Sequence, residues 1–393
     1  MTDIPAVSTY SPPADLDRLR RNALLLAAIG FAVSVVGAVV DFEQFSRSYL
    51  VAWLYWLGIA MGCFGILMLH HLTRGGWGLM IRRVLEAASR TLLLLALLFV
   101  PIALRLADVF VWARPGAGED PLIAHKSWFL NQPFFILRAV GYFAVWGVLV
   151  FALTRLSLRQ DRTGDPRLFR RMQSVAAPGM GIFALVGSLA AIDWMMSLDP
   201  HWYSSLFPIY FIGGQIVAGM AFTIVMVRYL SDRPPLESVF SAQHFHDYGN
   251  LLMAFVLLWS YFALSQFLII WSGNLAEETV WYLERQQGMW KWVSFSLATF
   301  HFSVPFFMLL SRRLKRNIGS LVRVAFLLLV MRFIDLYWLA APTFEHGHFS
   351  PHWLDLATLL AVGGLWVAIF VQELKKRSLL PIQDPYFEEA LDA

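Results

Sequence analysis

Long apolar runs, each closed by a short polar stretch, recur along almost the whole chain. A helix needs about 20 consecutive apolar residues to cross a bilayer. Ten runs approach that length, and we predict that each forms a membrane-spanning helix. The predicted spans lie near residues 23–41, 49–69, 90–112, 133–154, 175–196, 206–229, 247–272, 289–311, 319–341 and 353–373.

The composition supports an all-α integral membrane protein. Hydrophobic residues make up 58% of the chain and charged residues only 15%, so it is far more apolar than a soluble domain. We predict a cytoplasmic N-terminal tail over 1–22, a ten-helix transmembrane domain over 23–373 and a cytoplasmic C-terminal tail over 374–393. The first tail is polar and contains proline, unlike a secretory signal, so we expect the first span to be retained.

Lysine and arginine are concentrated in every second loop. The other loops hold only Arg47, Arg114, Lys126, Arg285 and Lys291. Basic loops stay on the cytoplasmic side of a membrane, so we expect a multi-pass protein of the bacterial cytoplasmic (inner) membrane with both termini in the cytoplasm. This distribution also explains the net charge of +4. Membrane lipid is therefore an expected partner, and nucleic acid is not.

Short segments that recur in similar form indicate an internal repeat. Ile192-Asp193 at the end of span 5 recurs as Ile334-Asp335 in span 9, and Trp128–Asn131 before span 4 recurs as Trp281–Glu284 before span 8. The matching segments are four spans apart, which predicts two parallel four-helix bundles, spans 2–5 and 6–9, with spans 1 and 10 peripheral. Secondary transporters more often contain inverted repeats, which this sequence does not suggest.

Ionisable residues inside the spans are the first candidates for function. A charge at the bilayer centre costs about 2.5–3.5 kcal/mol on insertion scales, so it needs a partner or a role. Arg105 and Asp108 in span 3, and Arg332 and Asp335 in span 9, each form an i, i+3 pair. Such a pair either locks helices together or serves as a proton relay or a contact to a quinone head group. Asp193 is the repeat counterpart of Asp335 and joins these candidates.

Further candidates for a proton path or a quinone site lie along spans 7 and 8 and the loop between them. They are His246, Asp247, Tyr261, Ser265, Gln266, Glu277, Glu278 and His301. Hydroxyl and amide groups along one helix suit a water-filled path, but they also suit hydrogen bonds between helices. His301 is either a hydrogen-bonded core residue or a relay. We expect Arg138 in span 4 to be structural, in a position from which its side chain could snorkel toward the outer surface. We expect His70 and His71 to be solvated.

Several chemistries are not indicated. The single cysteine, Cys63, excludes an intrachain disulfide and a thiolate metal cluster. Membrane haem b needs pairs of histidines on facing helices, and only His301 lies well inside a span. No P-loop or dinucleotide fingerprint occurs. We therefore expect no metal site and no covalently bound redox cofactor in this chain.

Two longer motifs resemble a known family. The first is Asp-Trp-x-Met-Ser-Leu-Asp-Pro-x-Trp-x-Ser over 193–204, and the second holds Trp259, Tyr261, Ser265-Gln266, Ile270-Trp271, Asn274 and Glu277-Glu278-Thr279. Both are similar to motifs in the membrane subunits of bacterial alternative complex III, a quinol:electron-acceptor oxidoreductase of the NrfD-like (polysulfide-reductase) type. That complex has two such membrane subunits, and in length the chain is similar to the shorter one, F, rather than to the longer one.

The resemblance implies a function in electron transport. It implies an integral subunit of a respiratory or photosynthetic quinol-oxidising complex that binds quinone or menaquinone, conducts protons, or does both. Its partners would be the longer NrfD-like membrane subunit, an iron–sulfur subunit and multihaem cytochrome subunits, with haems and clusters only in those partners. The chain itself would be either non-catalytic or quinone-binding. A secondary transporter and a purely structural membrane anchor are the alternatives.

Overall fold

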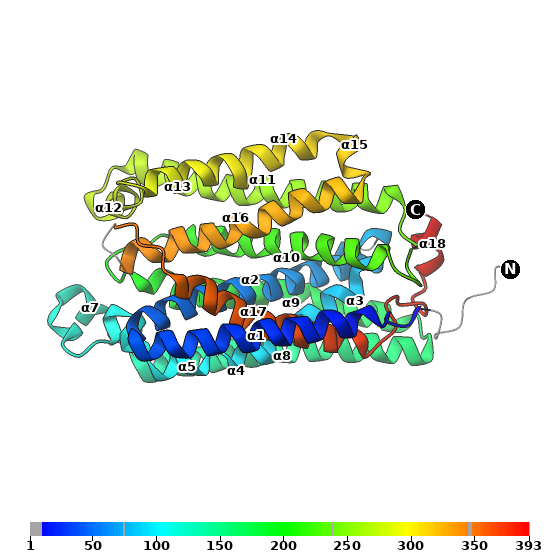
Figure 1. The fold of residues 1–393 in the computed structure, drawn as a ribbon, viewed down its shortest axis with the longest axis horizontal. Helices are drawn as coiled ribbons and strands as arrows, with labels where there is room; N and C mark the ends of the chain where they lie inside the picture. The colour runs from blue at the N-terminus through cyan, green and yellow to red at the C-terminus, as the bar shows by residue number, and fades with distance from the viewer. Residues whose placement is uncertain (1–9, 74, 238, 345–347, 393) are drawn as a thin grey trace.

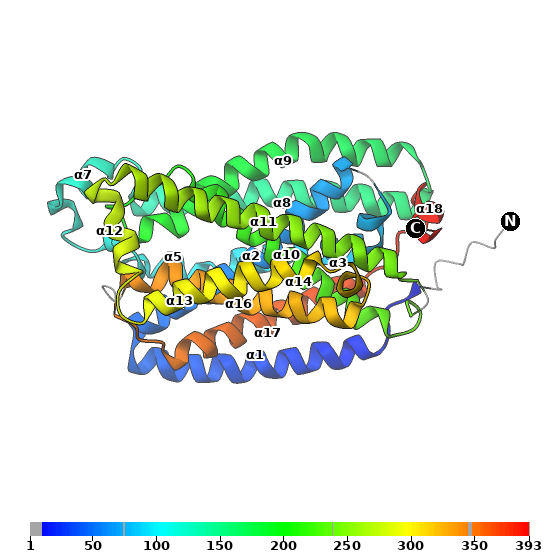
Figure 2. The same ribbon diagram turned by 90° about the horizontal axis from the view of Figure 1, so that it is seen from above.

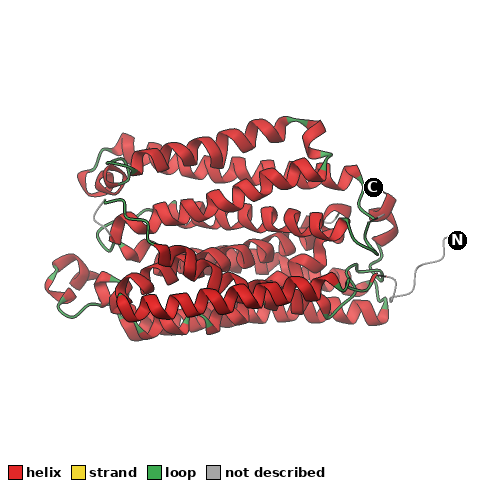
Figure 3. Cartoon of the chain, viewed as in Figure 1, coloured by secondary structure: helices red, strands yellow, loops and turns green. Residues whose placement is uncertain are grey.

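The long helices run side by side along one axis (Figure 1). The computed structural model describes residues 10–73, 75–237, 239–344 and 348–392, and these contain helices and connecting segments without a strand (Figure 3). Ten helical segments are long and apolar enough to cross a membrane, so the predicted all-α, ten-span, multi-pass membrane fold is confirmed. Their bounds are α1 (Asp15–Val40), α2 (Phe42–Thr73), α3 (Gly76–Arg90) continued by α4 (Leu92–Leu97) and α5 (Val100–Leu104), α8 (Gln132–Thr163), α9 (Arg167–Trp194), α10 (Phe207–Ser231), α11 (Ala242–Gly273), α13 (Trp290–Ser296) continued by the π-helix η5 (Leu297–Ser303) and α14 (Val304–Leu310), α16 (Ile318–Phe344) and α17 (Trp353–Lys375).

Short helices cover the two ends of the molecule. The start of α1 and α18 (Phe387–Asp392) lie at one end, called the terminal end below, and α7 (Pro121–Lys126) and α12 (Ala276–Glu284) lie at the other, the far end (Figure 1). The first nine residues of the predicted tail over 1–22 lie outside the described residues. The rest of that tail is partly helical, because α1 begins at Asp15.

Helices α2 and α10 cross at backbone contact in the middle of the molecule (Figure 2). A Cβ atom on Gly62 would lie only 1.9 Å from the carbonyl oxygen of Gln215, and one on Gly219 only 2.4 Å from the carbonyl carbon of Gly62. Small residues allow helix backbones to approach this closely in a membrane. This crossing joins the first half of the chain to the second.

The remaining helices pack around this crossing. α2 also contacts α3 and α9, and α8 packs on α9; α10 contacts α11 and α16, and α14 packs on α11. α1 packs along α17. The grouping of spans 2–5 and 6–9 into two parallel bundles stays a prediction.

Span 3 begins much earlier than its apolar run. It was predicted over 90–112, whereas the helical segment covers Gly76–Leu104. The additional part, α3, is polar in sequence but buried, with Arg82, Arg83 and Glu86 at most 4% exposed. His70 and His71 at the end of α2 are also buried, so the expectation that they are solvated is wrong.

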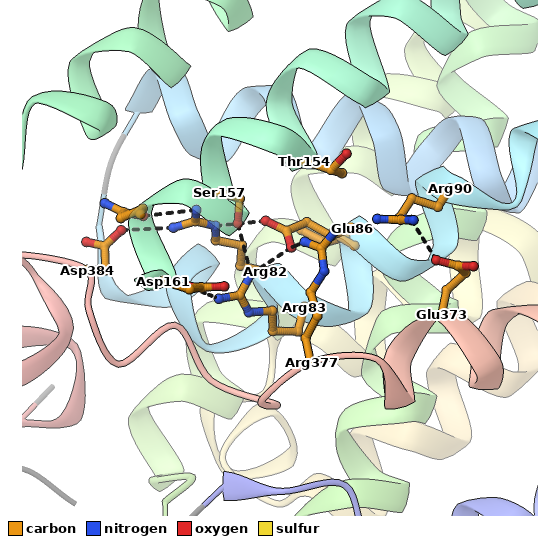
Figure 4. A network of polar contacts seen from close by, with 12 residues as sticks. Arg82, Arg83, Glu86, Arg90, Thr154, Ser157, Asp161, Glu373, Arg377 and Asp384 are labelled. Atoms are coloured by element: carbon orange, nitrogen blue, oxygen red, sulfur yellow. Dashed lines mark hydrogen bonds and ion pairs between the residues drawn. The ribbon is translucent and has the colours of Figure 1, made fainter. Parts of the chain in front are cut away.

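Ion pairs make this burial possible (Figure 4). Glu86 accepts hydrogen bonds from Arg82 Nε at 3.0 Å, Arg83 Nη1 at 2.8 Å and Arg377 Nη1 at 3.0 Å. Arg82 Nη1 also donates to Asp384 Oδ2 at 2.9 Å. Buried charges are tolerated when they are paired in this way. Because Arg377 and Asp384 belong to the C-terminal tail, the network fixes that tail to α3.

Candidate functional site

A cavity of about 490 Å³ lies between α10, α11, α12, α13, η5 and α16, in the half of the molecule near the far end. Most of its wall is apolar or aromatic. Its polar lining comes from Tyr210, Ser260, Gln266, Tyr282, Gln286, Ser294 and Asp335. Ligand sites commonly combine an apolar wall with a few converging polar groups, so this space, the Asp335 cavity, is the candidate site.

Asp335 is the only carboxylate among the described residues that line the cavity. Its side chain is fully buried, and the Tyr210 hydroxyl donates to Oδ1 at 2.7 Å. Its other oxygen pairs with the guanidinium of Arg332, one turn earlier on α16. Arg332 fits against Gly214 of α10, where a Cβ atom would lie 2.2 Å from Nη1. The carboxylate is thus held by a phenol and a guanidinium while it faces the cavity.

A second polar group lines the cavity near α12. Gln266 Nε2 donates to the Tyr282 hydroxyl oxygen at 3.2 Å. Burial raises the pKa of Tyr282 to about 12, so its phenol keeps its proton at neutral pH. Trp338 Nε1 donates to Ser294 Oγ at 2.8 Å, which fixes the wall between α13 and α16. The cavity therefore offers two separate hydrogen-bonded pairs, Tyr210–Asp335 and Gln266–Tyr282.

His301 lies in the π-helix η5. Pro305 follows four residues later, and a proline ring clashes with the carbonyl group of residue i−4, which accounts for the widened turn here. The imidazole is fully buried, and its ring centroid is 4.0 Å from that of Trp259, which lines the cavity. Among the described residues, neither ring nitrogen has a hydrogen-bond partner. Buried polar atoms of this kind are usually satisfied by water.

Arg285 supports the cavity from the far end. Its guanidinium is fully buried and donates to the carbonyl oxygens of Trp281 at 2.9 Å, Trp338 at 3.2 Å and Leu339 at 2.7 Å. Burial lowers the pKa of Arg285 to about 9, so it is still a cation at neutral pH. It ties α12 to the end of α16, so the aromatic wall of the cavity depends on it.

Asp193 is arranged differently from its predicted counterpart. Arg138 of α8 binds it with two hydrogen bonds, Nε to Oδ2 and Nη2 to Oδ1, both 2.8 Å, and the Tyr142 hydroxyl donates to Oδ2 at 2.7 Å. Arg138 therefore has a structural partner in Asp193, and its Nη1 also donates to the carbonyl oxygen of Phe129, which precedes α8, at 2.9 Å. Asp193 does not line the Asp335 cavity. Its bidentate pair is the stronger kind of ionic contact and joins α8 to α9.

The structure brings together part of the predicted set. Asp335, Gln266 and Tyr261 line the cavity, Arg332 contacts Asp335, and His301 packs against a lining residue. The predicted residues that do not line the cavity are Asp193, Arg105, Asp108, Ser265, Glu277, Glu278, His246 and Asp247.

Two of these groups lie elsewhere for clear reasons. Arg105 and Asp108 form the predicted pair at 2.7 Å, but they lie just beyond the end of the long helical segment at Leu104, and the Arg105 side chain is 54% exposed. The expected location of this pair inside a span is therefore wrong. His246 and Asp247 lie in the first turns of α11, at the terminal end. Thirteen residues of helix separate His246 from Trp259, which is about 20 Å.

Sequence reasoning missed Tyr210, Tyr282, Ser294 and Trp338. Trp338 follows Asp335 by three residues on the same helix face, which is a signal that could have been used. The tyrosines gave no such signal, because tyrosines are also common at membrane interfaces.

Comparison with protein-family models and with curated proteins finds no match for this chain. Among the described residues, no group of three or more His, Cys, Asp or Glu side chains is placed to hold a metal ion.

Proposed function

We propose that this protein is a membrane subunit of a quinol-oxidising electron-transfer complex of the alternative complex III type, and that the Asp335 cavity binds the quinone head group and passes on its protons. The observation that carries this proposal is the buried Asp335 carboxylate at the wall of an apolar cavity of about 490 Å³.

The shape and chemistry of the cavity suit a quinol. A quinol head group is a flat ring with two hydroxyl groups on opposite sides, so it needs apolar walls and a hydrogen-bonding group at each side. The Tyr210–Asp335 pair would meet one hydroxyl, and the Gln266–Tyr282 pair would meet the other. The volume falls within the range of small-molecule sites.

The entrance suits a ligand dissolved in the membrane. Tyr261 and Leu264 line the cavity, yet their side chains are 64% and 57% exposed on the outside of α11. The cavity therefore opens sideways from the helices rather than only at their ends. A membrane-soluble quinol could enter between these residues.

Asp335 suits the transfer of protons. Oxidation of a quinol to a quinone releases two electrons, which partner subunits would take, and two protons. A carboxylate within hydrogen-bond reach is a suitable acceptor, and Arg332 would stabilise its charged form. His301, with no protein partner at either nitrogen among the described residues, would be the next acceptor toward the terminal end. In this proposal the far end is periplasmic.

The first experiment is purification of the tagged chain from its native membranes. We expect a multihaem cytochrome, an iron–sulfur subunit and a quinone to co-purify with it. Recovery of the chain without haem, iron–sulfur cluster or quinone, in a mild detergent that keeps it folded, would contradict the proposal. Transport of a solute by the chain alone in liposomes would favour the transporter alternative.

A further inference from the structure

The hairpin formed by α8 and α9 has an unusual concentration of charge at the terminal end. Six arginines lie within 17 residues and all are exposed: Arg155, Arg159, Arg162, Arg167, Arg170 and Arg171. We call these six residues the arginine hairpin. None of them forms an ion pair with a carboxylate of the described residues, whereas two other basic residues of this end do, Arg233 with Asp15 and Lys375 with Asp17.

The acidic residues of the same hairpin already interact with other groups of the protein. Asp161 pairs with Arg83 at 2.5 Å, and Asp165 accepts a hydrogen bond from the backbone N–H of Arg167, the first residue of α9, at 2.9 Å. The positive charge of the arginine hairpin is therefore not compensated within the protein. Six guanidinium groups held this close together attract an external anion.

The arginines also lie on the same helix faces as two exposed apolar surfaces, one on α8 and one on α9. On α8, Val148, Phe151, Arg155, Arg159 and Arg162 follow one another at helical spacing, and Val148 and Phe151 are 67% and 62% exposed. One helix face is thus apolar in the middle of the molecule and basic at its terminal end.

The neighbouring helix α9 has the same arrangement. Leu185 and Ile182 are 65% and 39% exposed and lie on the same face as Arg171. α8 and α9 pack against each other, so together they present an apolar surface followed by a row of guanidinium groups.

We propose that the arginine hairpin and the apolar surface beside it bind an anionic phospholipid. The planar guanidinium group matches a phosphate with two hydrogen bonds, and the acyl chains would lie along Val148, Phe151, Ile182 and Leu185. A free anion would need only the arginines, whereas a lipid uses both surfaces. Basic residues next to membrane-spanning helices bind anionic lipid in this manner.

The test compares two triple variants of the purified protein. R155Q/R159Q/R162Q removes three charges from the arginine hairpin. R312Q/R313Q/R316Q removes three exposed arginines from the loop between α14 and α16, which contains the one-turn helix α15 (Arg312–Lys315), at the same end. Native mass spectrometry measures the phosphatidylglycerol retained on each after exchange into detergent, with phosphatidylcholine and inorganic phosphate as separate competitors.

We expect the hairpin variant to retain at least about tenfold less phosphatidylglycerol, since each basic side chain near an anionic surface contributes about a factor of five. The loop variant should stay within about twofold of the unmodified protein, and neither competitor should displace the lipid. Equal retention by the hairpin variant, an equal loss in the loop variant, or displacement by inorganic phosphate would overturn the proposal. R170Q/R171Q on α9 provides the same test if the first variant does not fold.

Discussion

Gly214 of α10 and Arg332 of α16 fit so closely that the glycine has no room for a side chain. A Cβ atom at Gly214 would lie 2.2 Å from Nη1 and 2.4 Å from Cζ of Arg332. The same guanidinium holds Asp335 at the cavity wall. The position of the proposed proton acceptor therefore depends on a glycine in a neighbouring helix.

This relationship gives the first prediction. Gly214→Ala should displace Arg332 and break its pair with Asp335, and loss of a partner from a buried ion pair costs about 3–5 kcal/mol. We expect a lower Tm of the purified complex and a lower rate of quinol oxidation. Gly213→Ala is the matched control, because its Cβ atom would meet its nearest neighbour, Trp259 Cα, at an ordinary 3.5 Å. Equal behaviour of the two variants would contradict this role of Gly214.

The crossing of α2 and α10 gives a second prediction. Gly62→Ala would place a Cβ atom 1.9 Å from the carbonyl oxygen of Gln215, so the two backbones would have to separate. We expect poor expression or a markedly lower Tm. Gly58→Ala, one turn away, meets only Gln215 Cγ at 3.5 Å and should be tolerated. If Gly62→Ala has the stability of the unmodified protein, the helices do not cross at this point.

The hydrophobic pattern was enough to predict the helices, since an apolar run of about 20 residues has few alternatives to a membrane span. It failed at α3, where Arg82, Arg83 and Glu86 look like loop residues. Their burial depends on partners in distant parts of the sequence, such as Asp384. A local hydrophobic pattern does not reveal an ion pair between residues so far apart in the sequence.

The candidate site was predictable only in part. Asp335 was identified because a carboxylate inside an apolar run is costly. The difference between Asp335 and Asp193 was not predictable, because each follows an isoleucine near the end of an apolar run. Asp193 contacts Arg138 and Tyr142, which both belong to the neighbouring helix α8. Asp335 contacts Tyr210 of α10 and Arg332 of its own helix, α16. Only the arrangement of the helices determines which carboxylate faces a cavity.

The C-terminal tail should contribute to stability through Asp384. Asp384→Asn removes one of the two carboxylates that pair with buried Arg82 and leaves only Glu86, and we expect the Tm in detergent to fall by about 5 °C or more, since loss of a partner from a buried ion pair is costly. Limited proteolysis should then cut the tail more rapidly. Glu388→Gln removes an exposed carboxylate from the same tail and should change neither result. An unchanged Tm for Asp384→Asn would show that the network does not hold the tail.

Arg285 should stabilise the aromatic wall of the cavity. Arg285→Met leaves the carbonyl oxygens of Trp281, Trp338 and Leu339 without their donor, and each buried unsatisfied group costs about 1–3 kcal/mol. We expect a lower Tm and weaker quinone binding, measured by quinone titration of the purified protein. Lys291→Met changes an exposed cation nearby and is the control. Unchanged quinone affinity in Arg285→Met would argue against a site beside these aromatic residues.

The most direct test of the central claim compares Asp335→Asn with Asp193→Asn in the isolated complex. Each variant removes one buried carboxylate that is held by an arginine and a tyrosine, but only Asp335 lines the cavity. With assembly verified by gel electrophoresis of the purified complex, we expect Asp335→Asn to lower the rate of quinol oxidation by at least about tenfold, since general acid–base groups typically contribute more than this. Asp193→Asn should keep at least about half of the rate. Full quinol oxidation by assembled Asp335→Asn complex, or an equal loss in both variants, would contradict the account.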